Sequence, residues 1–370
     1  MPSEPSRDFP RTPLPPGPRP GIGALDEMFK ELAMAPAIYR PTRFWEDFAE
    51  QHLAQLNEDG FENFKRTINQ NYFQFQFGSP FHPMARPLWG KWLRRPRLAP
   101  MRAHFPEGLE LQLGDSRVAK LRSASYARYI ALLADTVAEY DEDDLLGRLD
   151  EPLVGNPVYV EHRGRRLTED VANSVLEYSA VSNALPPDRL KGATIIELGS
   201  GYGRLAWCWL SARPDCRYVL VDIPPALGVA EQYLAELFPE RKIFGFRHFD
   251  TQDEVAAELA AAQIAFLTPN QLDLLPDLRA DLFINVSSLH EMVPAQIDHY
   301  FDVIDAHTDG WFYTKQWIRS INASDDVVIE RSRYPVKDRW QTVFDRTHPT
   351  NGDFFEALYR LDRARPKTGE

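Results

Sequence analysis

The sequence predicts an α/β protein that is built on a doubly wound, mostly parallel sheet and preceded by a mainly helical region. After residue 192, short β-rich runs alternate with helical segments. These runs are apolar on both faces, as in a parallel sheet that helices cover on both sides. Before residue 150, apolar residues recur at helical spacing instead. The length of 370 residues corresponds to about two domains.

We expect three segments along the chain. Residues 1–23 form a disordered leader, because the first twenty contain eight prolines and no apolar signal-peptide core. Residues 24–165 form a mainly helical cap, in which 43–59 is a helix that stops before Gly60. Residues 166–370 form a Rossmann-like domain, and Thr168 caps its first helix.

The strands of the second domain follow from their apolar, β-branched composition. We expect strands at 193–199, 216–222, 263–268, 280–286 and 310–317, with a helix over 224–238. Ligands of doubly wound sheets bind outside the carboxyl ends of the strands. The polar motifs described below all follow such ends.

Composition restricts the partners. The formal net charge of −12 argues against nucleic acid or an anionic membrane. No apolar run approaches the roughly 20 residues of a membrane span. The only cysteines, Cys208 and Cys216, form neither a disulfide framework nor a metal knuckle. We therefore expect a cytoplasmic protein with a small-molecule or glycan partner; the sequence does not indicate its oligomeric state.

A glycine-rich loop in "IIELGSGYGRLAW" joins the first strand to a helix. Glycines let a ligand approach the main chain closely, and the helix N-terminus adds a partial positive charge. Arg204 stands where the dinucleotide fingerprint requires a third glycine, and the Gly-Lys-Ser/Thr of a P-loop is missing. The spacing Glu-x-Gly-x-Gly-x-Gly is instead similar to that of S-adenosylmethionine-dependent methyltransferases, whose loop faces the amino-acid end and ribose of the cofactor.

Each part of this region then has an expected contact with S-adenosylmethionine. Glu197 suits the cofactor's ammonium group. Asp222, which ends the second strand, suits the ribose hydroxyls, although it is also placed to cap the next helix. In the turn after the third strand, Asn270, Gln271 or Asp273 are candidates for the adenine amine, and we favour Gln271. The complete set of expected cofactor-binding residues is Glu197, Gly199, Ser200, Gly201, Gly203, Asp222, Ile223, Gln271 and Asn285.

A polar cluster follows the fourth strand in "DLFINVSSLHEM". A hydroxyl is a poor nucleophile near neutral pH, so a general base contributes about 10²–10⁴-fold to its methylation. His290 is our candidate base because histidine titrates near neutrality. Glu291 could orient His290, bind the acceptor or be the base itself. A Mg²⁺ site at these residues lacks a clear third carboxylate, so we expect no metal. Lys315 ends the next strand at the same rim.

The motifs "IIELGSGYGRLAW", "YVLVDIPPAL", "FLTPNQLDLL" and "LFINVSSLHEM", in this order, resemble the sugar O-methyltransferases of bacterial surface-polysaccharide gene clusters. Two N-terminal stretches, "FWEDFAEQHLAQLNEDGFENFKRTINQNYF" and "GNPVYVEHRGRRLTEDVANSVLEY", also resemble this family, so the resemblance extends over about residues 40–320. It implies a seven-stranded methyltransferase-type sheet, a sugar hydroxyl as acceptor and a role in polysaccharide biosynthesis. The "LHE" segment also resembles the "LHDW" segment of small-molecule O-methyltransferases, in which the histidine is the base.

Two other functions remain open. One is O-methylation of a phenol or another secondary metabolite. The other is a non-catalytic partner subunit that binds S-adenosylmethionine. An oxidoreductase is disfavoured because Arg204 breaks the dinucleotide fingerprint.

Overall fold

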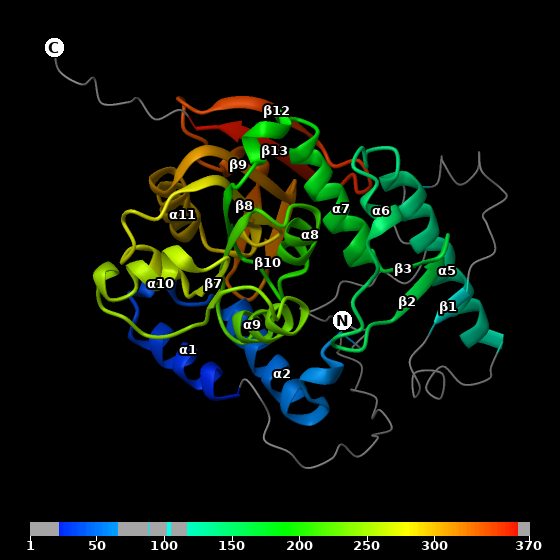
Figure 1. Cartoon of the computed structure of the whole chain (residues 1–370), viewed down its shortest axis with the longest axis horizontal. Coiled ribbons are helices and arrows are strands. Elements are labelled where there is room, and N and C mark those ends of the chain that lie inside the picture. The colour runs from blue at the N-terminus through cyan, green and yellow to red at the C-terminus, as the bar shows by residue number, and fades with distance from the viewer. Residues whose placement is uncertain (1–21, 66–87, 89–101, 105–116, 362–370) are drawn as a thin grey trace.

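A central sheet of eight strands organises the computed structural model, which describes residues 22–65, 88, 102–104 and 117–361. The sheet has the order β12-β13-β9-β8-β4-β5-β7-β6 (Figure 1). Its neighbours pair in parallel from β9 to β6, whereas β13 is antiparallel to both β9 and β12. The strands are β4 (Thr194–Leu198), β5 (Arg217–Val221), β6 (Ile243–Phe244), β7 (Ile264–Leu267), β8 (Ala280–Val286), β9 (Thr308–Trp317), β12 (Gln341–Thr347) and β13 (Phe354–Arg360).

The predicted doubly wound, mostly parallel sheet is therefore confirmed, and the five expected strands lie where their composition placed them. The sheet has one strand more than the expected seven, because the two-residue β6 adds to its edge beside β7. The C-terminal hairpin of β12 and β13 completes the opposite edge.

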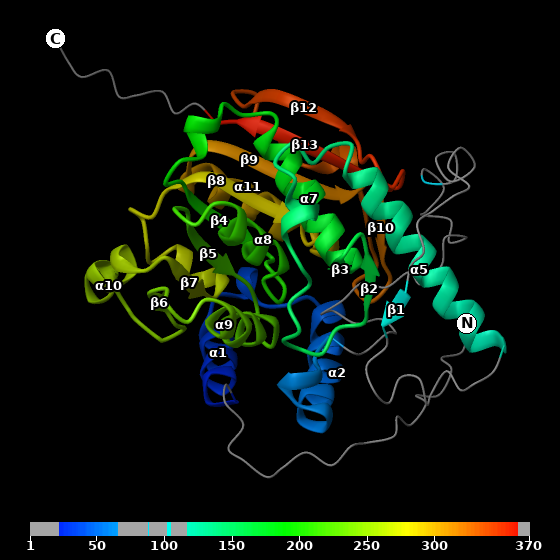
Figure 2. The ribbon, with the colours of Figure 1, turned by 45° about the vertical axis from the view of Figure 1, so that its right-hand side comes forward.

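Helices cover both faces of the sheet, as Figures 1 and 2 show. Neighbouring residues of β4 belong to different cores: Ile195 packs with α7, α8 and α9, whereas Ile196 packs with α10 and α11. Such alternation is expected of a strand that is buried on both faces. The helices are α5 (Arg117–Val137), α6 (Leu145–Arg148), α7 (Glu169–Ser182), α8 (Arg204–Ala212), α9 (Ala226–Leu237), α10 (Ala256–Ala261) and α11 (Pro294–His307).

The N-terminal region contains both helices and a small sheet. Its helices α1 (Ile22–Met34) and α2 (Arg43–Asp59) lie beside the central sheet, below α9 in Figure 2. As predicted, α2 ends at Gly60, where φ is +77°. The small antiparallel sheet has strands β1 (Arg102–His104), β2 (Tyr159–His162) and β3 (Arg165–Leu167). The expected boundary at residue 165 stays a prediction, and residues 1–21 of the expected leader lie outside the described residues.

Short elements complete the chain. A second small antiparallel pair joins β10 (Arg319–Asn322) to β11 (Val327–Glu330). The 3-10 turns are Ala37–Tyr39, Phe61–Asn63, Pro187–Leu190, Gln252–Glu254, Pro269–Leu272, Leu289–Glu291 and Arg331–Arg333.

The strand order places a switch point between β4 and β8. From β4 the chain winds outward to β5 and β7, and it then returns to β8 and β9 on the other side. Connections leave in opposite directions there, which opens a crevice at the carboxyl ends of the strands. The segments that follow β4 and β8 lie close together there, because a Cβ built on Gly199 would lie 2.2 Å from Ser288 Oγ. In addition, φ of Gly199 is +73°. Only glycine fits this position of the loop.

A buried ion pair fixes the start of α7. Lys65 is fully buried, and its ammonium group lies 2.6 Å from Glu151 Oε1 and 3.1 Å from the Tyr233 hydroxyl. The other oxygen of Glu151 accepts the hydroxyl hydrogen of Thr168 at 2.6 Å. Thr168 Oγ1 in turn accepts the N–H of Val171, so it caps α7 as predicted.

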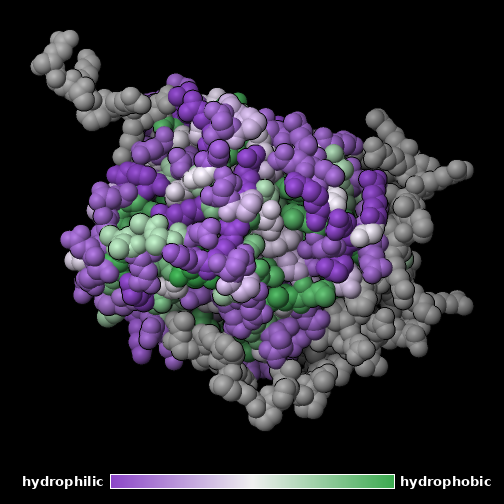
Figure 3. Space-filling view, viewed as in Figure 1, coloured by the Kyte–Doolittle hydropathy of each residue, from purple (hydrophilic) through white to green (hydrophobic). Residues whose placement is uncertain are grey.

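Most of the described surface in the view of Figure 3 is hydrophilic. Among the residues described, none of the helices combines the length and the hydrophobicity needed to cross a bilayer.

We predict that Lys65→Met lowers the free energy of unfolding by about 3–5 kcal/mol, because it leaves the buried Glu151 carboxylate without its cation. The double variant Lys65→Met/Glu151→Leu should recover at least half of this loss. Urea denaturation measures both values. The control is Arg165→Met, which breaks the more exposed pair with Asp150 and should cost less than about 1 kcal/mol. An equal loss in the single and double variants would contradict the prediction.

Candidate functional site

A cavity of about 510 Å³ lies at the carboxyl ends of β4, β5 and β8. It therefore occupies the crevice that the switch point predicts. Its lining residues come from α7, the glycine loop and the strand ends, together with the N-terminal segment around α2. They are Tyr39, Arg40, Pro41, Thr42, Phe44, Trp45, Phe48, Asp170, Glu197, Leu198, Gly199, Ser200, Gly201, Tyr202, Arg204, Asp222, Ile223, Pro269, Val286, Ser287, Ser288, Glu291, Met292, Gln296 and Tyr300.

The glycine loop is held in shape from the neighbouring strand. Asp222, at the end of β5, accepts the N–H of Gly201 at 2.6 Å and the N–H of Ile223 at 2.7 Å. A Cβ built on Gly201 would meet no atom within 4 Å, so the loop borders open space there. Beside it, the Ser200 hydroxyl is buried and has no hydrogen-bond partner among the described residues. The loop thus offers unused polar contacts to a ligand.

Glu197 is an ionisable group whose neutral form the fold favours. Its side chain is buried and accepts a hydrogen bond from the Tyr218 hydroxyl at 2.8 Å. Burial outweighs the Tyr218 hydrogen bond and raises the pKa of Glu197 to about 8. A cationic ligand in the cavity would favour the carboxylate form.

Asp170, in the first turn of α7, is a second such acid. Its Oδ2 accepts the Tyr202 hydroxyl hydrogen at 2.8 Å. Burial is the main cause that raises the pKa of Asp170 to about 6, although nearby Arg204 opposes it. Asp170 and Tyr202 both line the cavity, so α7 contributes directly to the site.

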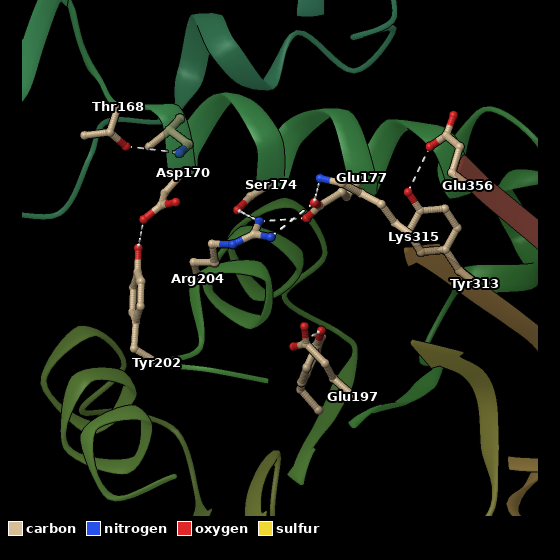
Figure 4. Close-up of polar contacts among 12 residues, drawn as sticks. Thr168, Asp170, Ser174, Glu177, Glu197, Tyr202, Arg204, Tyr313, Lys315 and Glu356 are labelled. Carbon is tan, nitrogen blue, oxygen red and sulfur yellow. Dashed lines mark hydrogen bonds and ion pairs between the residues drawn. The ribbon is translucent and has the colours of Figure 1, made fainter. Parts of the chain in front are cut away.

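Arg204, which breaks the dinucleotide fingerprint, is tied to α7 rather than left free for a phosphate (Figure 4). Its guanidinium group makes two bonds to the Glu177 carboxylate, of 2.7 and 3.1 Å, and a third to Ser174 Oγ at 2.9 Å. Lys315 of β9 reaches the same carboxylate at 2.7 Å. Burial would raise the pKa of Glu177, but Arg204 and Lys315 outweigh it and lower that pKa to about 2.

The ionisable side chains that line the cavity are mostly acidic among the residues that the structure describes. These are four acids, Asp170, Glu197, Asp222 and Glu291, and two arginines, Arg40 and Arg204. Arg204 is also held by Glu177, whose carboxylate it shares with Lys315. An excess of carboxylates in a partly desolvated cavity favours a cationic ligand and disfavours a pyrophosphate.

An aromatic wall formed by Phe44, Trp45 and Phe48 of α2 borders the cavity. Their ring centroids lie 4.8–5.8 Å apart, and all three side chains are half-buried. Distant residues hold this wall in place. Asp325 accepts the N–H groups of Arg43 and Phe44, and Gln296 donates to the carbonyl oxygens of Ile38 and Arg40.

His290 and Glu291 are neighbours that stand differently relative to the cavity. Glu291 lines the cavity, whereas His290 does not and is only 2% exposed. The Nε2 atom of His290 lies 3.5 Å from Glu291 Oε1. His290 therefore lies behind Glu291, and this geometry does not support direct contact between His290 and an acceptor.

Three expected cofactor-binding residues are not among those that line the cavity, and their contact with a cofactor stays a prediction. Gln271 is fully buried: its Oε1 accepts the N–H of Thr268 and its Nε2 donates to the carbonyl of Arg247, so it caps a turn instead of lining the cavity. Asn285 is fully buried and joins the ends of β4 and β8 by donating to the Leu198 carbonyl at 2.8 Å. A Cβ built on Gly203 would lie 3.1 Å from Leu234 Cδ1, so there is little room for a side chain there.

The remaining expected residues do meet in the cavity. They are Glu197, Gly199, Ser200, Gly201, Asp222, Ile223 and Glu291. Sequence reasoning missed Asp170, Arg204 as a lining residue, and Tyr202. The acidic first turn of α7 was visible in the sequence, but nothing in its spacing indicated that it faces the glycine loop.

Comparisons with known proteins give limited additional information. No family model matches the sequence, and no curated protein matches it. Among solved structures, the mitomycin 7-O-methyltransferase MmcR is 14% identical with a TM-score of 0.35, covering 52% of this chain and 58% of that one. Magnesium protoporphyrin IX methyltransferase (ChlM) from Synechocystis PCC 6803, solved with bound SAM, is 12% identical with a TM-score of 0.37, covering 53% and 83%.

TrmN from Thermus thermophilus is 15% identical with a TM-score of 0.33, covering 51% of this chain and 49% of that one. The chain thus spans less than two thirds of the mitomycin enzyme and of TrmN. Similarities of this extent leave the activity of this chain to be derived from its own residues.

We predict that Glu197→Gln stabilises the protein against unfolding increasingly as pH rises. Because the folded-state pKa of Glu197 is raised, its contribution to stability is complete below about 4.5 and is lost as pH rises through about 8. Glutamine mimics the neutral acid. Between pH 5 and pH 8 the variant should gain on the order of 2–5 kcal/mol relative to wild type in the free energy of unfolding.

Glu177→Gln serves as the control with the opposite sign. Its pKa is lowered, so its charge stabilises the protein above about pH 4.5, and that contribution is lost as pH falls through about 2. This variant should be less stable than wild type at neutral pH. Denaturant titrations at several pH values measure both effects; a pH-independent difference for Glu197→Gln would contradict the account.

Proposed function

We propose that the protein is an S-adenosylmethionine-dependent O-methyltransferase that acts on a hydroxyl of a sugar or glycoside. The observation that supports this best is the cavity beside the glycine loop, where acidic side chains outnumber basic ones among the described lining residues. S-adenosylmethionine carries a sulfonium and an ammonium group, whereas NADH and nucleotides carry phosphates. The lining charges therefore favour the first cofactor over the others.

The residues present fit the proposed cofactor. Gly201 and the unpartnered Ser200 hydroxyl provide space and a hydrogen-bonding group beside the loop. Asp222 would accept hydrogen bonds from the ribose hydroxyls, as acids at the end of the second strand do in such folds. Glu197 and Asp170 would receive the ammonium group, and their raised pKa values would then fall.

When bound, the cofactor would supply a methyl group on a sulfonium centre. The chain's own contribution is to hold an acceptor oxygen in line with that group, to exclude water and to remove the hydroxyl proton. The aromatic wall of Phe44, Trp45 and Phe48 would cover the acceptor, while Glu291 stands on the lining at the end of β8. Glu291 is thus the lining carboxylate best placed to accept a proton there.

The sugar acceptor rests on the sequence resemblance and is compatible with the aromatic wall, because aromatic side chains pack against the apolar face of a sugar ring. A phenolic ring would also pack there, so phenol O-methylation is the second candidate. A non-catalytic cofactor-binding subunit is the third candidate. Wild-type turnover that is lost in Glu291→Ala would exclude it, because a non-catalytic protein has no turnover to lose.

We predict that titration calorimetry detects micromolar binding of S-adenosylmethionine and S-adenosylhomocysteine and no binding of NADH. Asp222→Ala should weaken S-adenosylhomocysteine binding at least about 100-fold, because it removes charge-assisted hydrogen bonds and the anchor of the loop. Asp250→Ala is the matched control, since Asp250 is 82% exposed and lies outside the lining. Binding of NADH alone would contradict the proposal.

The acceptor class is tested by turnover with methyl hexopyranosides, nucleotide-linked hexoses and catechol, read as release of S-adenosylhomocysteine. Turnover with a carbohydrate of this panel is expected. Turnover with catechol alone would favour the phenolic candidate. Cofactor binding without turnover on any acceptor of the panel would favour the partner subunit.

A further inference from the structure

A fully enclosed polar network lies behind Glu291 and consists of Asn285, His290 and Gln316. Asn285 and Gln316 are completely buried, and His290 is 2% exposed. Amide orientations and the imidazole tautomer follow from a network that ends on main-chain groups. A main-chain carbonyl only accepts hydrogen bonds and a main-chain N–H only donates them.

The orientation of Asn285 is fixed at both ends. One atom of its amide lies 2.8 Å from the Leu198 carbonyl oxygen, which accepts, so this atom is Nδ2. The other lies 3.3 Å from the Leu289 N–H, which donates, so this atom is Oδ1.

The orientation of Gln316 then follows from Asn285. The Gln316 amide atom that lies 2.6 Å from Asn285 Oδ1 must donate, so it is Nε2. It also donates to Thr314 Oγ1 at 2.9 Å. The remaining atom, Oε1, accepts the main-chain N–H of His290 at 3.3 Å, which agrees with this orientation.

The tautomer of His290 is the last consequence. Its Nδ1 lies 2.9 Å from Gln316 Oε1, an acceptor, so Nδ1 carries a hydrogen. In neutral imidazole Nε2 then has a lone pair, and it faces Glu291 Oε1 at 3.5 Å. The rings of Trp317 and Phe354 stand nearly perpendicular to the imidazole, with centroids 6.2 Å away. A single proton can therefore be held between Glu291 Oε1 and His290 Nε2. The rings of Trp317 and Phe354 stand beside the imidazole.

We propose that Glu291 is the catalytic base, that His290 stores the proton behind it, and that Gln316 is a positioning residue that fixes the His290 tautomer. This inference rests on the proposed O-methylation. As the acceptor oxygen gains the methyl group, its O–H bond breaks and the proton passes through Glu291 to Nε2 of His290. The bonding pair of the methyl–sulfur bond remains on sulfur, so the sulfonium loses its positive charge. Glu291 is again a carboxylate at the end of the step and His290 carries the positive charge, which leaves a thioether and an imidazolium–carboxylate pair.

The first test needs neither cofactor nor acceptor. Nitrogen NMR of the full chain with ¹⁵N-labelled histidine reports the tautomer, and His290→Gln identifies the signal among nine histidines. We expect Nδ1 of His290 to carry the hydrogen and Nε2 to carry none in the free protein. A hydrogen on Nε2 there would overturn the inference, while leaving the proposed function untouched.

The second test separates a positioning role from a structural one. With the methyl hexopyranoside that turns over best, Glu291→Gln should lower kcat by about 10²–10⁴-fold, the range of general-base catalysis. Gln316→Leu should lower kcat at least about 10-fold. In both variants, the dissociation constant of S-adenosylhomocysteine should stay within about 2-fold. Thr314→Val, which removes another partner of Gln316 on the same strand, should stay within about 3-fold of the wild-type kcat.

The double variant decides the matter. If Gln316 acts through Glu291 and His290, Gln316→Leu should have less than about a 3-fold further effect in the Glu291→Gln background. A full 10-fold effect there, or wild-type turnover in Glu291→Gln, would overturn the inference. Failure of all variants and wild type to turn over, with Nδ1 protonated, would instead count against the proposed function.

Discussion

Carboxylates that are buried at the carboxyl edge of the sheet are the constraint on which the site depends. Asp170 and Glu197 are held where burial disfavours their charge, and the pKa values of about 6 and 8 express this. Glu177 is equally buried, but its pKa is not raised because Arg204 and Lys315 both pair with its carboxylate. Arg204 is thus tied to α7, while the acids Asp170, Glu197 and Asp222 remain on the cavity lining.

Several elements of the fold hold these acidic side chains at the cavity. The switch point between β4 and β8 opens the crevice. Helix α7 reaches the crevice from the face of the sheet on which Ile195 packs with α7, α8 and α9. The buried chain from Lys65 through Glu151 to Thr168 fixes where α7 starts, and hence where Asp170 stands. The protein therefore gives up stability at Glu197 and Asp170, which a cationic ligand would restore on binding, as is common at functional sites.

The sequence predicted the sheet, its strands and the glycine loop because each is a local pattern of apolar periods and turn residues. It predicted Glu197, Asp222 and Glu291 as lining residues because each ends a parallel strand or follows one closely. It misplaced Gln271 and His290, since the spacing gives no information about which polar side chain turns inward to satisfy main-chain groups. Asp170 escaped because it reaches the cavity from another part of the chain, whereas the aromatic wall belongs to the N-terminal region that was expected to form a cap.

A crystal structure of the protein with S-adenosylhomocysteine tests the central claim most directly. The account predicts ligand density in the cavity, with the ribose hydroxyls on Asp222, the main chain of the loop against the amino-acid end, and the ammonium group near Glu197 or Asp170. Density elsewhere on the protein, or a cavity that stays empty under conditions in which calorimetry shows saturation, would contradict it.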